Sequence, residues 1–439
     1  MRFKQVNLSP PQILVLLYLF FLVIGTLLLK LPIATTKPIG VLDALFTITS
    51  AMTVTGLVVF DTGTVYTTFG EVVIMIWIQL GGLGIMSFAV LVFIMLGKKI
   101  GFKERILIQQ SLNQTSLGGV IRLVKQLFIF AFLIEGIAMI CLATVWVPEF
   151  GWGKGLYFSL FHSISAFNNA GFGLLPDNLM RYVGNPVINI VITLLFIIGG
   201  IGFTVLVDLW TKPSFRKLSL HSKLMIIGTF ILNVVAMIVI FLLEKDNPAT
   251  IGGLSGLDQF WASYFQAVSP RTAGFNTIDI TQIEDATAFF MCLLMFIGAG
   301  SASTGGGIKL TTFLVIVFSV ITYLKGNEKL VVRKRMISTE IVHKSLSIST
   351  MSFLFVFLAV FIMTISEKAN FVVILFEVLS AFGTVGLSMG LTYELTWVGK
   401  VILIFMMFLG KIGPLTLVFT LAKPHKERIG YPSEDVLAG

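Results

Sequence analysis

The sequence predicts an all-α integral membrane protein built from four pseudo-symmetric repeats. Three observations support this fold class: an apolar composition, eight long apolar runs, and a short motif that occurs four times. Hydrophobic residues make up 56% of the 439 positions and charged residues 12%, whereas charged residues supply about a quarter of an ordinary soluble protein. We therefore expect residues 1–439 to form a single membrane domain, with neither terminus carrying a soluble domain.

The apolar runs are long enough to cross a membrane, which takes about 20 residues. They come in pairs, and each pair belongs to one of four repeats, over residues 1–110, 111–217, 218–334 and 335–439. The runs lie near residues 13–31, 72–97, 126–147, 187–210, 224–243, 287–324, 349–366 and 395–421. They predict eight transmembrane helices.

The recurring motif lies between the two runs of each pair. An aromatic residue is followed ten positions later by a glycine and then by Leu or Phe. The copies are FTITSAMTVTGL from Phe46, FHSISAFNNAGF from Phe161, YFQAVSPRTAGF from Tyr264 and FEVLSAFGTVGL from Phe376. Each is too short to span the bilayer, so we expect a re-entrant loop, which descends as a short helix and returns as extended chain. Irregular backbone survives at membrane depth where it lines a water-filled cavity, so four such loops predict one central pore.

The motif glycines point to a cation filter. They are separated by 115, 103 and 112 residues, and glycine permits the positive φ that turns successive carbonyls toward one axis. The segment TVTGL shares a pattern with the TVGYG loop of potassium channels, whose carbonyls replace the water shell of the ion. We expect K⁺ to bind the backbone carbonyls in a short filter. Its predicted residues are Val54, Thr55, Gly56, Asn169, Ala170, Gly171, Thr272, Ala273, Gly274, Thr384, Val385 and Gly386. A single glycine of this kind could instead serve helix packing.

The distribution of basic residues predicts the topology. Segments 1–12, 98–125, 212–223, 325–344 and 423–439 hold 21 of the 31 lysines and arginines, and acid-rich connections alternate with them. By the positive-inside rule these basic segments are cytoplasmic, which places both termini inside the cell. The net charge of +9 therefore reflects membrane topology, and we expect no nucleic-acid partner.

The second apolar run of the third repeat cannot form an unbroken helix. The stretch from Ile297 to Phe313 contains five glycines together with hydroxyl side chains and Lys309. We expect residues 298–307 to form an intramembrane loop that obstructs the pore below the filter, while a glycine-rich packing surface is the alternative. The predicted gate comprises Gly298, Gly300, Ser301, Ser303, Thr304, Gly305, Gly306, Gly307 and Lys411.

Lys411 lies in the second run of the fourth repeat at a comparable depth. An ionisable group inside a bilayer usually faces a cavity or a partner. Lys411 could act as an electrostatic barrier, could hold the loop by bonding its carbonyls, or could extend to the cytoplasmic surface, and the sequence leaves these three roles open.

Other polar residues have less definite roles. Glu377 and His162 each follow the motif aromatic, and we expect structural hydrogen bonds from both. Asp43, Asp61 and Asp177 either attract cations at the outer mouth or are simply solvated.

At this point the chain resembles the membrane subunit of the Trk/Ktr/HKT potassium-uptake superfamily, most closely the Ktr branch, over essentially its whole length. The resemblance implies potassium selectivity, because serine at the first motif glycine accompanies sodium selectivity in the family and this chain has Gly56. It implies activation by Na⁺, a homodimer, and a cytoplasmic RCK/KTN-type ring through which ATP or ADP would act. It also implies a gating loop at residues 298–307, and an arginine where this chain has Lys411.

Three other functions are alternatives to potassium uptake. A sodium or non-selective monovalent cation transporter is the alternative within the same class. An intramembrane enzyme would need a catalytic constellation, and neither HExxH nor paired transmembrane aspartates occur. An alternating-access carrier usually shows two inverted repeats, whereas these four repeats share one orientation.

Overall fold

The protein is described by a computed structural model, which covers residues 10–85, 87–88, 91, 106, 119–421 and 434. Within these ranges the chain is helical apart from loops, and its two strands form one small antiparallel hairpin of β1 (Val331–Val332) and β2 (Arg335–Met336). Helices satisfy their own backbone hydrogen bonds, which is what a bilayer requires of a spanning segment. The predicted all-α fold is confirmed. Of the predicted basic segments, residues 1–9, 98–105, 107–118, 423–433 and 435–439 lie outside the described residues.

The helices follow one another in the order that the repeats predict. The first repeat contains α1 (Pro10–Leu29), α2 (Val41–Thr53), α3 (Thr62–Val65) and α4 (Thr68–Leu83). The second contains α7 (Val120–Phe167), η1 (Met180–Tyr182), α8 (Pro186–Ile201), α9 (Phe203–Thr211) and η2 (Phe215–Lys217). The third contains α10 (Leu220–Glu244), α11 (Gly256–Val268), η3 (Ile280–Gln282), α12 (Asp285–Phe296) and α13 (Leu310–Leu324). The fourth contains α14 (Thr339–Ser366), α15 (Phe371–Gly383), η4 (Leu391–Tyr393), α16 (Trp397–Ile412) and α17 (Pro414–Leu421).

The first long helix of each repeat can cross a membrane. Among the described residues, four helices are long and apolar enough to do so: Pro11–Leu29, Ile121–Phe167, Leu220–Glu244 and Thr339–Ser366. The second of these runs on into the short motif helix of its repeat, and the two are separated by a kink at Gly151 (φ 80°). The protein is therefore a multi-pass membrane protein, while the total of eight spans stays a prediction.

The second helix of every repeat is interrupted, and not only that of the third. Glycines with positive φ end α4, α8 and α16 at Gly84 (φ 86°), Gly202 (φ 107°) and Gly413 (φ 90°), because this backbone angle leaves the helical region. The bend between α8 and α9 is 94°. The sequence carries a shared signal for these breaks, GGLGI, GGIGF and GKIGP, which our sequence analysis missed.

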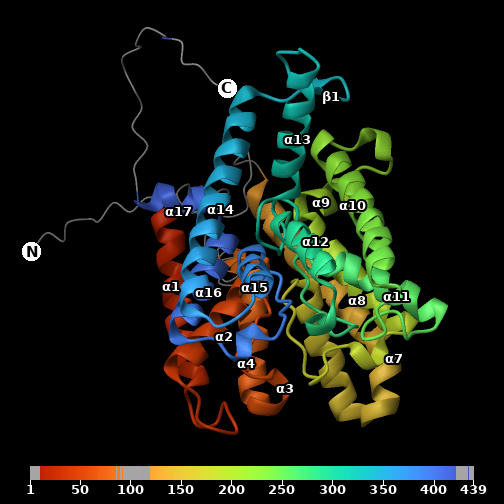
Figure 1. The fold of residues 1–439 in the computed structure, drawn as a ribbon, viewed down its shortest axis with the longest axis vertical. Coiled ribbons are helices and arrows are strands. Elements are labelled where there is room, and N and C mark those ends of the chain that lie inside the picture. Colours follow the sequence, from red (N-terminus) through yellow and green to blue (C-terminus); the bar gives the residue numbers. More distant parts are fainter. Residues whose placement is uncertain are drawn as a thin grey trace, which may run out of the picture.

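The repeats contact one another in cyclic order. Helix α4 packs on α7, α8 on α11, α12 on α15, and α16 returns to α2. Short helices α2, α11 and α15 lie inside this arrangement, and their inner residues are buried. The hairpin of α13 and α14, with the β1 strand at its tip, projects from one end of the molecule (Figure 1). The ring of contacts is the four-fold arrangement that the spacing of the motif predicts.

Candidate functional site

Each motif segment reverses direction directly after its short helix. In all four copies the residue two positions before the motif glycine has a left-handed backbone, at Val54 (φ 53°), Asn169 (φ 58°), Thr272 (φ 74°) and Thr384 (φ 50°). The motif glycines also have positive φ, between 70° and 95°. A left-handed backbone is uncommon for residues other than glycine. Its occurrence at the same position in four repeats shows that the four loops turn in the same way just before the glycine.

The four loops close into a ring around the motif glycines. A Cβ added at any of these glycines would meet the backbone of a neighbouring loop. A Cβ on Gly56 would lie 2.5 Å from the Ala170 carbonyl oxygen, and one on Gly171 would lie 3.1 Å from the Ala273 carbonyl oxygen. A Cβ on Gly274 would lie 2.2 Å from the Val385 carbonyl oxygen, and one on Gly386 would lie 2.1 Å from the Thr55 carbonyl oxygen. Each glycine therefore faces the residue before the next glycine, and the fourth repeat returns to the first. Binding of a cation by these carbonyls stays a prediction.

A serine on or directly after each short helix supports its loop. The Gly56 and Gly386 amides donate to the Oγ atoms of Ser50 and Ser380, each over 3.0 Å. Ser165 Oγ donates to the Phe172 carbonyl over 2.7 Å, and Ser269 Oγ donates to the Phe275 carbonyl. These serines were not predicted from the sequence, although three of them precede the motif glycine by six positions.

The third loop is one residue shorter than the others. The motif aromatics Phe46, Phe161 and Phe376 are fully buried, and in the third repeat the fully buried ring is Phe265. Tyr264, which we aligned with them, is only partly buried, and its hydroxyl lies 3.0 Å from the Thr193 hydroxyl. The aromatic in register is therefore Phe265, and the predicted scaffold role of Tyr264 is corrected.

The residue after each buried aromatic braces the chain beyond the filter in three repeats. The Thr47 hydroxyl lies 2.9 Å from the Tyr66 hydroxyl, and His162 Nε2 accepts from the Leu174 amide over 3.4 Å. The Glu377 carboxylate accepts from Ser388 and Thr392. The expectation of structural hydrogen bonds for His162 and Glu377 is thus confirmed. The equivalent Gln266 has no hydrogen-bond partner among the described residues.

A second buried polar group lies behind the second loop. The Glu135 carboxylate accepts hydrogen bonds from Gln79 Nε2 (3.0 and 3.1 Å) and from Asn168 Nδ2 (3.3 Å). Asn168 ends the motif helix of the second repeat. Glu135 therefore anchors the end of this helix.

The glycine-rich segment of the third repeat forms a loop against the underside of the filter. Its two ends pair as a parallel bridge between Ile297 and Ile308, so the chain between them is a closed loop without helix. It is fixed on one side by α8, because the Gly300 amide donates to the Gly200 carbonyl over 2.8 Å and the Thr304 amide donates to the Gly199 carbonyl over 3.3 Å. The loop is therefore not a helix-packing surface.

The same loop bonds directly to side chains of the filter. Thr304 Oγ1 donates to Asn169 Oδ1 over 3.0 Å, and the Gly306 amide donates to Thr384 Oγ1 over 2.8 Å. Asn169 Nδ2 in turn donates to Thr272 Oγ1 over 3.1 Å. The structure thus brings predicted filter residues of three repeats together with two predicted gate residues.

Two lysines hold the loop. Lys411 Nζ donates to the Thr304 carbonyl, and Lys309 Nζ donates to the Gly305 carbonyl. Three roles were left open for Lys411, and the bond that the structure shows matches the second of them, in which Lys411 holds the loop through a carbonyl. Lys309 was not among the predicted gate residues. Its position beside a break in the helix does not indicate which group its ammonium would contact.

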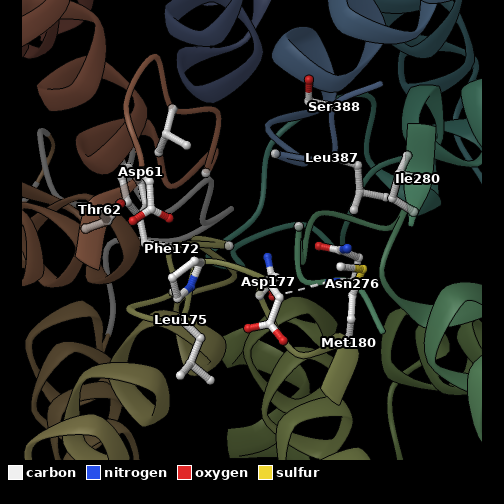
Figure 2. A pocket seen from close by; sticks show the side chains of 18 of the residues that line it. Asp61, Thr62, Phe172, Leu175, Asp177, Met180, Asn276, Ile280, Leu387 and Ser388 are labelled. Carbon is white, nitrogen blue, oxygen red and sulfur yellow. Dashed lines mark hydrogen bonds between the residues drawn. The ribbon is translucent and has the colours of Figure 1, made fainter. Parts of the chain in front are cut away.

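Cavities lie on both sides of this assembly. The outer one has a volume of about 230 Å³ and includes the four motif glycines in its lining. Figure 2 shows that side chains of all four repeats surround it, such as Asp61, Asp177, Asn276 and Ser388. The inner cavity has a volume of about 300 Å³ and is lined by residues of the loop, by the breaks at Gly84 and Gly413, and by Lys309, Lys344 and Lys411.

The carboxylates near the outer mouth differ in their surroundings. Asp43 forms an ion pair with Lys400 at 2.7 Å, and Asp177 pairs with Arg181 at 2.8 Å. The hydrogen bonds from Arg181 hold the pKa of Asp177 below its usual value. Asp61 accepts a hydrogen bond from the Thr64 amide, and its side chain lines the outer cavity. Asp279 also lines this cavity, although it was not among the carboxylates predicted at the outer mouth. Two of the three predicted carboxylates thus already have cationic partners within the chain.

Comparisons with known proteins give a consistent result. A family profile described as "Cation transport protein" (TrkH) matches residues 10–429. "Ktr system potassium uptake protein B" of Bacillus subtilis (strain 168) is 57% identical over 436 residues, covering 99% of this chain and 98% of the relative. The protein of the same name from Vibrio alginolyticus is 43% identical over 431 residues, covering 98% and 95%. The crystal structure of the potassium transporter TrkH from Vibrio parahaemolyticus superposes with a TM-score of 0.73 at 20% identity, over 96% of this chain and 87% of that one, which supports the fold.

Proposed function

This chain belongs to the TrkH family of cation transport proteins, and we propose that it takes up potassium ions across the cell membrane through the ring of four glycine loops. The observation that carries the proposal is the cyclic contact between each motif glycine and the carbonyl before the next one. Potassium is favoured over sodium because the relatives with 57% and 43% identity are named potassium uptake proteins. The glycine at position 56 agrees with this choice.

The ring offers a way to bind a dehydrated cation. Carbonyl oxygens from Thr55, Ala170, Ala273 and Val385 would replace water around the ion, and each comes from a different repeat. One glycine per loop makes the filter short, so few ions bind in line. The outer cavity, with the carboxylates of Asp61 and Asp279 in its lining, gives hydrated cations a polar approach from outside.

The loop at residues 298–307 is proposed to close the pathway below the filter. Its position supports this role, because it bonds to filter side chains on one side and borders the inner cavity on the other. A bond from a charged donor contributes about 1.5–3 kcal/mol and a neutral one about 0.5–1.5 kcal/mol. Breaking the bonds of Lys411, Thr304 and Gly306 together therefore costs several kcal/mol. This cost keeps the pathway closed until a partner or an ion offsets it.

Regulation is proposed to come from other subunits. The relatives are named as parts of a Ktr system, which supports a further regulatory subunit. We propose that this subunit is a cytoplasmic RCK/KTN-type ring that binds ATP or ADP, and that it acts on a homodimer of this chain. The basic connections would face the ring if both termini are cytoplasmic. Stimulation by Na⁺ belongs to the same proposal.

Flux measurements test the proposal. The purified full-length protein in proteoliposomes should take up rubidium as a tracer for potassium, and excess potassium should compete with rubidium far better than excess sodium does. Equal competition by sodium would favour the non-selective alternative, and an absence of flux with and without the candidate ring would overturn the proposal. Uptake measured at several sodium concentrations tests the stimulation separately.

A further inference from the structure

A buried arginine stands beside the third filter loop without a counter-charge. Arg271 directly precedes the filter residue Thr272, and it is 8% exposed. Its side chain lies against α10, where NH1 donates to Asn233 Oδ1 over 3.3 Å. The Nε atom has no hydrogen-bond partner among the described residues.

No carboxylate of the described chain neutralises this guanidinium. The four ion pairs within 4 Å that the described residues form are Asp177 with Arg181, Asp208 with Lys212, Asp246 with Lys245, and Asp43 with Lys400. The carboxyl end of α11 supplies roughly half a negative charge, which leaves part of the positive charge uncompensated. A buried charge without a partner is strongly unfavourable, so a further negative group is required.

A small cavity lies against the same guanidinium. It has a volume of about 20 Å³ and is lined by Arg271, by Thr229 and Asn233 on α10, by residues of α8, and by Ala299 at the start of the gating loop. This volume suits a single water-sized particle. The Thr229 hydroxyl also lacks a partner among the described residues, and the Asn233 carbonyl oxygen already accepts from Arg271.

The groups around the cavity are donors. Arg271 offers N–H groups, Thr229 offers an O–H group, and the free part of the Asn233 amide is its NH₂ group. A water molecule accepts hydrogen bonds there but leaves the charge of the guanidinium in place. Phosphate and sulfate are too large for the cavity. A monatomic anion satisfies the donors and also neutralises the charge.

We propose that Arg271, Thr229 and Asn233 form a binding site for one halide ion, chloride under ordinary conditions. The site joins α8, α10, the third filter loop and the beginning of the gating loop. Occupancy fixes Arg271 and therefore the adjacent Thr272, whose hydroxyl accepts from Asn169. Chloride thereby stabilises the cation filter without entering the pathway, and this role does not depend on which cation is transported.

Thermal unfolding of the purified full-length protein tests the site. With potassium concentration and ionic strength held constant, the unfolding midpoint should rise saturably as chloride or bromide replaces isethionate, which is too large for the cavity. The variant Arg271→Gln should lose this dependence. The matched control Arg181→Gln, whose arginine is 42% exposed and pairs with Asp177, should keep it.

Two results would overturn the proposal. One is an equal midpoint in chloride and isethionate for the unaltered protein, which needs no variant and therefore stands even if Arg271→Gln fails to fold. The other is a structure determined in bromide whose anomalous density shows no peak beside the Arg271 guanidinium, in which case the cavity holds water only. A bromide peak bonded to Arg271 and Thr229 supports the site.

Discussion

Alanine substitution of the four motif glycines should reduce cation uptake in a graded order. The added Cβ would meet a carbonyl oxygen at 2.2 Å in Gly274→Ala and at 2.1 Å in Gly386→Ala. Ordinary van der Waals contact begins at 3.4 Å, so the neighbouring loop must retreat by more than about 1 Å. In Gly171→Ala the nearest atom lies at 3.0 Å, and a shift of about 0.4 Å suffices. The left-handed backbone adds about 1–2 kcal/mol of strain for alanine at each site.

The assay is rubidium uptake into proteoliposomes, with the unfolding midpoint measured on the same preparations. Displacing a reacting group by 1 Å costs about a hundredfold in enzymes, and we expect uptake by Gly274→Ala and Gly386→Ala to fall by at least about tenfold. Gly171→Ala should retain more activity than either. The matched control is Gly136→Ala in α7, where a Cβ meets no atom within 4 Å. The reasoning is refuted if Gly171→Ala is the most damaging of the four, or if all variants behave like the control.

Three further predictions concern the gate and the outer surface. Lys411→Met removes the bond to the Thr304 carbonyl, so basal rubidium uptake should rise by about ten- to a hundredfold, as a loss of about 1.5–3 kcal/mol implies; unchanged or lower uptake in folded protein would contradict the proposed latch. Glu367→Ala leaves the amide and the hydroxyl of Thr396, at the start of α16, without their acceptor. This change should lower the free energy of unfolding by about 1–3 kcal/mol in a denaturation measurement, and Glu367→Gln should lower it by less. Arg181 lowers the pKa of Asp177, so their pairing stabilises the protein above the unfolded pKa of about 3.9, and this stabilisation is lost as the pH falls through the lower folded pKa. Because both groups are partly exposed, Asp177→Asn should reduce the difference in unfolding free energy between pH 7 and pH 3 by less than about 1 kcal/mol. A larger change would argue against this assignment.

The positions of the four loops could be predicted from the sequence, whereas the partners of most buried polar side chains could not. The motif glycines mark four places where the chain needs a positive φ, and the structure has it at each of them. The register of the third repeat was missed by one residue, because Tyr264 and Phe265 are both aromatic and only burial distinguishes the scaffold ring from its neighbour. The breaks at Gly84, Gly202 and Gly413 were missed because a glycine in an apolar run also suits a continuous, closely packed helix.

Partners that are distant in sequence could not be predicted. Thr304 and Asn169 are 135 positions apart, and Thr304 and Lys411 are 107 apart. A buried side chain has several hydroxyls and carbonyls within its reach. The one that it contacts depends on how the second helices of the four repeats cross beneath the filter. For the same reason the partners of Lys309 and Arg271 could not be predicted from the sequence.

The sequence by itself determined that this protein is helical, lies in a membrane and repeats one unit four times, because hydrophobic length and the recurrence of a motif are properties of the chain alone. The tertiary structure decided the cyclic closure of the four loops, the bonds between the glycine-rich loop and the filter, and the solitary position of Arg271. Packing brings segments more than a hundred residues apart within hydrogen-bond distance, and in a low-dielectric interior the value of each polar group is set by the neighbour it meets there.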